Sequence, residues 1–269
     1  MVAIDSIVFV FLAGLVTAIA TGIGALPFFL VDELNLRWEV GLWGLASGIM
    51  VSASVFGLLR EGLREAGSGF LLGSGILTGV FLVLAAEKIV HSHEVDPREF
   101  EQADFNKLLI ILGILTVHSF PEGVAVGVSF AEMGLTGGLP LFGLAVPVLG
   151  VVMTVAIAIH NIPEGTAISI PLRSMGVSKW RMVGWSIFSS LPQPVGAVIA
   201  FVFVRAAKQL LPFGYGFGAG AMIFLVLYEF LPEGLEHGEE LPGGGKKELA
   251  AGFLFGALLM VPLVLLEPV

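Results

Sequence analysis

Apolar and polar positions divide this chain into eight long apolar runs separated by short polar segments. A helix that spans a membrane needs about 20 consecutive, mostly apolar residues. The runs lie at roughly 6–31, 40–59, 66–86, 108–133, 141–171, 182–204, 210–235 and 249–266. We therefore predict an all-α integral membrane protein with eight transmembrane helices in one bundle, and residues 1–269 as a single transmembrane domain.

The composition supports this prediction and narrows the possible partners. The chain is 56% hydrophobic and only 13% charged, with a mean hydropathy of +0.96, whereas a soluble domain is about a quarter charged. A net charge of −9 argues against nucleic acid as a partner. The absence of cysteine excludes disulfides and thiolate metal ligands. The lipid bilayer is the partner that the composition predicts.

Positive charges in the loops predict the orientation. Most lysines and arginines follow the first, third, fifth and seventh runs, and loops rich in Lys and Arg favour the cytoplasmic side. Both termini are therefore predicted outside, and the longest polar stretch, 91–106, is predicted to be cytoplasmic. The segment from Met1 to Asp5 lacks the positive charge of a cleavable signal peptide, so we expect the first span to be retained.

Small residues in the seventh run indicate how that helix packs. Glycines at positions 214, 216, 218 and 220 form two overlapping pairs with small-xxx-small spacing. Such pairs allow close packing of membrane helices. A contact between two copies of the chain is the alternative.

The most informative motif, His-x-x-Pro-Glu-Gly, occurs twice, in the fourth and fifth runs. It places His118 four residues before Glu122, and His160 four residues before Glu164, so each pair shares one helical face. A charged carboxylate at membrane depth costs about 2.5–3.5 kcal/mol by insertion scales. Two such pairs therefore predict a metal site inside the membrane, and hence metal transport. A structural His–Glu hydrogen bond within each helix is the alternative.

Each copy of the motif also contains a proline, Pro121 or Pro163. Proline lacks an N–H and clashes with the carbonyl four residues earlier, so both helices are predicted to kink beside their His and Glu. Carbonyls freed in this way face ion sites in broken helices. Imidazole suits Zn, Fe, Ni and Cu, and carboxylates add tolerance for Mn. Two His and two Glu make a plausible tetrahedral set for a divalent metal.

With these two motifs on consecutive spans, the chain resembles the ZIP (Zrt/Irt-like) divalent metal transporters, of the prokaryotic type, over essentially its whole length. The resemblance implies a homodimer in the cell (inner) membrane with both termini outside. It implies a primary site of His118, Glu122, His160 and Glu164 with Asn161 beside them, and further ligands from spans 2, 6 and 7. Residues 46–50 resemble the family's span-2 segment, where Met50 would lean on the metal; a core methionine is the alternative.

Two positions depart from the pattern of many family members. Ser119 stands where Asn is common, and Gln193 stands where span 6 often has Glu. Both belong to a second metal site in two-metal members, and losing a carboxylate removes a full charge from a low-dielectric pocket. We infer that the second site is weak or absent and that one metal is the working stoichiometry. Gln193 can still offer a neutral oxygen, or it can serve only helix packing in a proline-rich kink.

Other polar residues flank the predicted site. Glu229 and Glu233 lie one turn apart near the end of the seventh run and are predicted to guide the cation, with a solvated helix end as the alternative. Glu87 is similar but lies beside Lys88. His91 and His93 follow the third run, where the family often has a His-rich, metal-collecting loop; a solvated loop is the alternative.

The sequence thus predicts transport of a divalent transition metal into the cytoplasm, with zinc foremost and iron, manganese, cobalt and cadmium possible. No nucleotide-binding motif and no organic cofactor are predicted. The chain lacks the His-Glu-x-x-His of intramembrane metalloproteases, so it is not expected to be an enzyme. A metal sensor or structural protein that binds without flux is the alternative.

Overall fold

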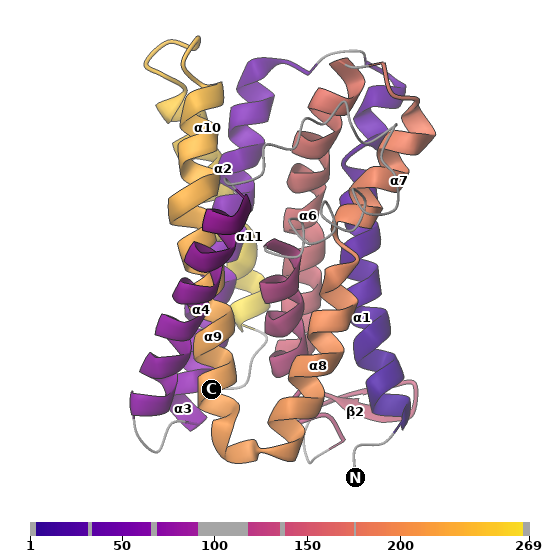
Figure 1. Cartoon of the computed structure of the whole chain (residues 1–269), viewed down its shortest axis with the longest axis vertical. Coiled ribbons are helices and arrows are strands. Elements are labelled where there is room, and N and C mark those ends of the chain that lie inside the picture. Colours follow the sequence, from indigo (N-terminus) through magenta and orange to yellow (C-terminus); the bar gives the residue numbers. More distant parts are fainter. Residues whose placement is uncertain are drawn as a thin grey trace.

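A computed structural model describes residues 4–31, 34–65, 69–90, 118–134, 138–174 and 176–265. It is a bundle of long helices that run along a common axis (Figure 1). The first half contains α1 (Ile4–Ile23), η1 (Leu26–Phe29), α2 (Leu36–Ser52), η2 (Ala53–Leu59), α3 (Arg60–Glu65), α4 (Gly69–Val90) and a helix over 118–129. The second half contains β1 (Leu139–Leu141), β2 (Leu144–Val146), α6 (Val148–Ser174), α7 (Lys179–Ser189), α8 (Pro192–Ala206), η4 (Lys208–Leu210), α9 (Leu211–Leu225), η5 (Val226–Phe230), α10 (Leu231–His237) and α11 (Lys246–Leu265).

Five helical stretches among the described residues are long and apolar enough to cross a membrane. They are Ile4–Phe29, Leu36–Glu65, Val148–Ile170, Lys179–Ala206 and Lys208–His237, and α4 contributes a shorter apolar helix, Gly69–Ala85. These stretches coincide with predicted runs, so the prediction of a mostly helical chain with several apolar helices of membrane-spanning length is confirmed. The count of eight stays a prediction.

A small β-hairpin corrects the predicted start of the fifth span. The apolar run begins at 141, but α6 begins only at Val148, after β1 and β2 have paired antiparallel. Phe142 and Gly143 between the strands both have positive φ, 50° and 78°, as a tight two-residue hairpin turn requires. Pro147 then precedes the first turn of α6. The residues of this hairpin are apolar, so hydrophobicity alone does not separate them from the helix.

The sixth predicted span is broken at its proline-rich segment. Helix α7 ends at Ser189 and α8 begins at Pro192. Proline suits the first position of a helix because its missing N–H is not needed there. The break places Gln193 in the first turn of α8. By contrast, α6 continues as one helix through Pro163, and the predicted kinks at Pro121 and Pro163 stay predictions.

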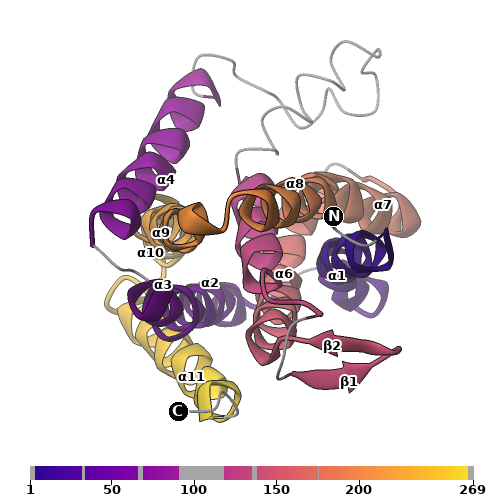
Figure 2. The same cartoon turned by 90° about the horizontal axis from the view of Figure 1, so that it is seen from below.

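The helices pack in two sets, which Figure 2 shows side by side. Helix α1 packs against α6, α7 and α8, whereas α2 packs mainly against α11, and α4 against α9. In the second set, Gly216 and Gly220 of α9 lie against the backbone of Leu72 and Ile76 in α4. The predicted role of these glycines in close helix packing is thus confirmed. Helix α2 of the second set also packs against α6 of the first.

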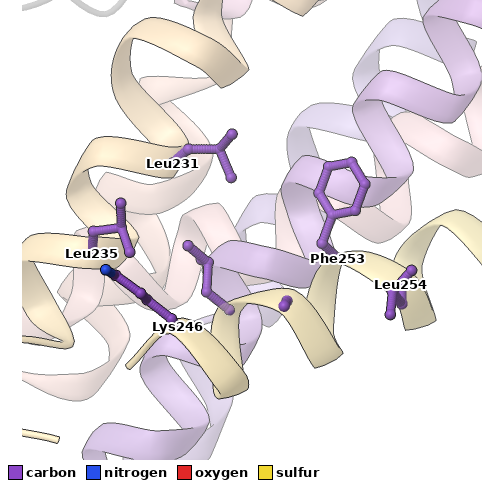
Figure 3. Close-up of a pocket in the computed structure, with 7 residues that line it drawn as sticks. Leu231, Leu235, Lys246, Phe253 and Leu254 are labelled. Atoms are coloured by element: carbon purple, nitrogen blue, oxygen red, sulfur yellow. The ribbon is translucent and has the colours of Figure 1, made fainter. Parts of the chain in front are cut away.

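An open groove of about 510 Å³ lies between α10 and α11 (Figure 3). The side chains that line it are apolar apart from that of Lys246. A cation site needs oxygen, nitrogen or sulfur ligands that are free of positive charge. This groove therefore does not offer a metal site.

Candidate metal centre

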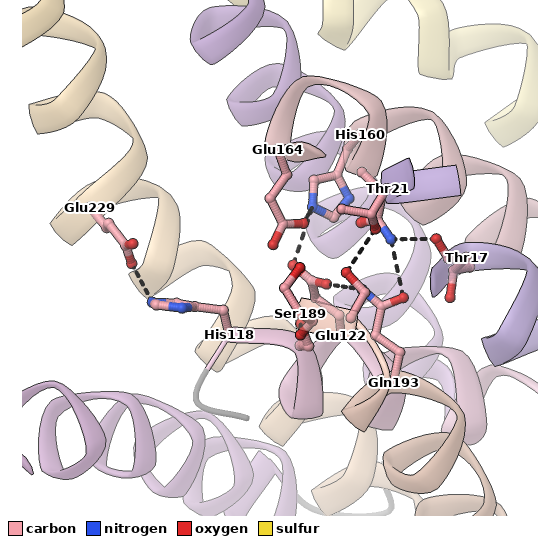
Figure 4. Close-up of polar contacts among 12 residues, drawn as sticks. Thr17, Thr21, His118, Glu122, His160, Glu164, Ser189, Gln193 and Glu229 are labelled. Carbon is pink, nitrogen blue, oxygen red and sulfur yellow. Dashed lines mark hydrogen bonds and ion pairs between the residues drawn. The ribbon is translucent and has the colours of Figure 1, made fainter. Parts of the chain in front are cut away.

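Three side chains from two helices converge in the core of the bundle (Figure 4). Ligand atoms of Glu122, from the helix over 118–129, and of His160 and Glu164, from α6, all lie within 4.8 Å of one another. The Nε2 atom of His160 is 3.2 Å from Oε1 of Glu122 and 4.0 Å from Oε2 of Glu164. His160 is fully buried and Glu122 is 1% exposed. One imidazole and two carboxylates thus share a site whose His160 and Glu122 are buried and whose Glu164 side chain is 14% exposed.

The glycine of each motif explains how these helices come close enough. A side chain on Gly165 would run into the backbone carbonyl of Thr21 in α1, and one on Gly123 would run into the backbone of Gln193 in α8. Each glycine directly follows the motif's glutamate. The two helices therefore pack backbone to backbone against α1 and α8 at the level where their carboxylates point inward.

Several buried polar atoms of this site have no hydrogen-bond partner within the described part of the chain. They are both ring nitrogens of His160, Oε2 of Glu164 and Oδ1 of Asn161. The His160 and Glu122 atoms are close, but their orientation does not make a hydrogen bond. Leaving a buried polar group unsatisfied costs about 1–3 kcal/mol. A divalent cation would satisfy nitrogen and carboxylate oxygens together, so this donor set fits a metal ion.

His118 lies apart from this group. Its Nε2 atom is 2.6 Å from Oε2 of Glu229 in η5, and both side chains are partly exposed, at 19% and 23%. The sequence predicts that His118 joins Glu122, His160 and Glu164 in one set of four. The structure brings three of the four together and places the fourth against the second set of helices (Figure 4).

Glu229 lies on a π-helical turn that was not predicted from the sequence. In η5 the N–H of Leu231 bonds to the carbonyl of Val226, five residues earlier. Pro232, which follows, has no N–H to give to the carbonyl of Tyr228, and this proline is the signal that could have indicated the turn. Such π-turns inside α-helices are frequent at functional sites.

A chain of amides adjoins Glu122. The Nδ2 atom of Asn161 donates to the backbone oxygen of Thr17 at 2.7 Å and to Oε1 of Gln193 at 3.1 Å. The Nε2 atom of Gln193 donates to Oε2 of Glu122 at 2.5 Å. Ser119 takes no part in this chain, because its hydroxyl donates to the backbone oxygen of Ser189 at 3.0 Å.

Comparison with known proteins decides the family. The profile of the ZIP zinc transporter family matches residues 91–263. The chain is 30% identical to the zinc transporter GufA of Myxococcus xanthus over 261 residues, which cover 93% of this chain and 96% of that protein. It is 35% identical to the zinc transporter ZIPB of Bordetella bronchiseptica over 233 residues, 82% of this chain and 71% of that protein. The chain belongs to the ZIP family.

A plant relative extends the comparison. The chain is 43% identical to a putative zinc transporter of Arabidopsis thaliana over 221 residues, 81% of this chain but only 33% of that longer protein. Members of the ZIP family are transporters, so the expectation that this chain is not an enzyme is confirmed.

The remaining predicted site residues of this ZIP chain are placed as follows. Met50 is 1% exposed and belongs to the main hydrophobic cluster, which favours the core reading; its contact with a metal stays a prediction. Glu233 lies in the first turn of α10, one turn after Glu229. His91 and His93 lie outside the described residues, as does the whole loop 91–106, and the side chain of Glu87 is not described.

Proposed function

We propose that this ZIP transporter carries Zn²⁺ across the cell membrane into the cytoplasm through a site formed by Glu122, His160 and Glu164. Family membership supports transport of divalent metal ions, and the relatives named above are zinc transporters. The observation that carries the proposal is the convergence of one imidazole and two carboxylates within 4.8 Å, with His160 and Glu122 buried and Glu164 partly buried. Iron, manganese, cobalt and cadmium are further candidates, since these ligands do not separate them.

His118 is the proposed fourth ligand. Zinc is almost always bound by four groups in closed sites, and His118 lies one helical turn before Glu122 on the same helix. It would have to leave Glu229, which lies 2.6 Å away, to reach the ion. Four further residues are proposed to lie near the ion: Asn161, Gln193, Met50 and Glu229. Of these, Glu229 lies on the path of the ion rather than in the closed site.

The wider architecture is also part of the proposal. Eight spans, kinks at Pro121 and Pro163, termini outside, a cytoplasmic loop at 91–106 and a homodimer fit the sequence pattern and its family resemblance. The separate packing of α1, α6, α7 and α8 from α2, α4, α9 and α11 supports a motion of one set against the other. Glu122, His160 and Glu164 all lie on the side of the first set, so the ion would travel with it.

Uptake into proteoliposomes tests this proposal. Purified protein is reconstituted, and entry of Zn²⁺, Cd²⁺, Mn²⁺, Fe²⁺ and Co²⁺ is followed beside protein-free vesicles and the double variant His118→Ala/Glu122→Ala. The proposal expects saturable uptake that the variant loses, with Zn²⁺ among the ions carried. Metal binding by the wild type without uptake would contradict it and favour a sensor or structural role.

A further inference from the structure

Gln193 is fully buried beside the proposed metal ligands, at a position where the family resemblance leads one to expect a carboxylate. Its side chain has two functional ends, an oxygen that accepts and an NH₂ that donates. Which end faces Glu122 decides whether Gln193 is able to lend an oxygen to a metal. The hydrogen bonds around it answer this question, and the inference drawn from them rests on the function proposed above.

The backbone oxygen of Thr17 determines which atom of each amide donates and which accepts. The backbone oxygen of Thr17 can only accept, so the atom of Asn161 that lies 2.7 Å from it must belong to the NH₂ group. The same NH₂ group lies 3.1 Å from Gln193, which must therefore present its oxygen. The NH₂ group of Gln193 is then left to face Glu122, at 2.5 Å. This order follows from hydrogen-bond chemistry and does not depend on how amide nitrogen and oxygen are distinguished.

The two carboxylate oxygens of Glu122 have different neighbours. Oε2 accepts from Gln193, whereas Oε1 lies 3.2 Å from Nε2 of His160. Oε2 is thus fixed by a hydrogen bond, and Oε1 faces the proposed metal site. Both amides are 0% exposed, so water does not compete for these bonds.

We propose that Gln193 is a positioning residue that aims the carboxylate of Glu122 at the metal through a relay from Thr17 and Asn161, and is not itself a ligand. The oxygen of Gln193 accepts from Asn161, and it is the NH₂ group rather than this oxygen that faces Glu122. The relay takes the place that a second carboxylate would fill in a two-metal member. Groups that orient metal ligands in this way typically contribute 10–100-fold to metal affinity.

Zinc binding by the detergent-purified full chain tests the relay. Gln193→Leu removes the donor with little change of volume, and Gln209→Leu, at an exposed position, is the matched control. We expect Gln193→Leu to weaken the Kd for Zn²⁺ by about 10–100-fold and Gln209→Leu to leave it unchanged. X-ray absorption at the zinc edge should give the same number of nitrogen and oxygen ligands in Gln193→Leu as in the wild type. One ligand fewer would make Gln193 a ligand and overturn the inference.

A double-mutant cycle supplies a second measurement that needs no metal. Residues of one hydrogen-bond network show non-additive effects, so the losses in Tm of metal-free Gln193→Leu and Asn161→Leu should not add in the double variant. Additive losses would overturn the relay. Wild-type protein that binds no Zn²⁺ would overturn the proposed function and this inference together, whereas wild-type binding with an unaltered Kd in Gln193→Leu would overturn this inference alone.

Discussion

Nε2 of His118 lies 2.6 Å from Oε2 of Glu229, and this contact joins the helix over 118–129 to the π-helical turn η5 of the other helix set. His118 belongs to the same motif as Glu122, yet the two side chains contact different residues: His118 contacts Glu229, and Glu122 contacts His160. The contact therefore places a proposed metal ligand apart from Glu122, His160 and Glu164. It also links the two sets of helices whose relative motion is proposed above.

Removing the charge of Glu229 should slow transport without abolishing binding. In Glu229→Gln the three converging ligands are intact, so we expect the Kd for Zn²⁺ to stay within about threefold of the wild type, less than the 10–100-fold typical of groups that orient ligands. The rate of uptake should fall more than the affinity, because the ion loses a carboxylate on its path. Equilibrium binding and initial uptake rates, measured on the same preparation, separate the two effects. A loss of affinity equal to that of Glu122→Gln would place Glu229 in the site itself.

The two converging carboxylates, Glu122 and Glu164, should contribute comparably to binding. Both Glu122→Gln and Glu164→Gln remove an anionic ligand from the same group, so each should lower Zn²⁺ affinity beyond the detection limit of calorimetry. Glu236→Gln, on an exposed position of α10, controls for the loss of one negative charge. Retained affinity in either buried variant would remove that residue from the ligand set.

The glycine after each motif glutamate should tolerate no side chain. In Gly165→Ala the added methyl group would meet the carbonyl of Thr21, and overpacking of this kind costs about 1–3 kcal/mol. We expect a lower Tm and weaker Zn²⁺ binding, since α6 must shift away from α1. Gly184→Ala in α7, where nothing lies within 4 Å of the added group, is the control and should keep both. Equal Tm values for the two variants would contradict the close-packing account.

Replacing Gln193 by Glu should change the number of bound ions. The substitution would put a second carboxylate about 2.5 Å from Glu122, and two like charges at that distance repel strongly in a low-dielectric site. A second cation would relieve the repulsion, so the Zn²⁺ stoichiometry should rise from one toward two per chain. Inductively coupled plasma analysis of the loaded, washed protein measures this. An unchanged ratio of one would argue against a latent second site.

The apolar runs and the repeated motif predicted most of what positions the site. Period and spacing alone bring His160 and Glu164 together, because four residues make one helical turn, and the repeat places Glu122 on a neighbouring span. The position of His118 could not be predicted in this way, since its partner Glu229 lies 111 residues further along the chain and depends on tertiary packing. Which end of the Gln193 amide faces Glu122 could not be predicted either, because it depends on a backbone oxygen of α1.

Two local turns also could not be predicted from the sequence. Phe142 and Gly143 form a hairpin turn although their neighbours are apolar, and the usual Asn-Gly signal is absent there. The π-turn at Glu229 has only Pro232 to indicate it. In both places a short irregularity lies inside an apolar run, where hydrophobicity carries no information about backbone hydrogen bonding.

The most direct test of the account is the rate of Zn²⁺ uptake into proteoliposomes by Glu164→Gln beside Glu236→Gln. Both variants lose one negative charge, but only Glu164 lies among the converging ligands. We predict that Glu236→Gln transports at the wild-type rate and that Glu164→Gln does not transport above the level of protein-free vesicles. Wild-type uptake by Glu164→Gln would contradict the claim that the ion crosses through this buried site.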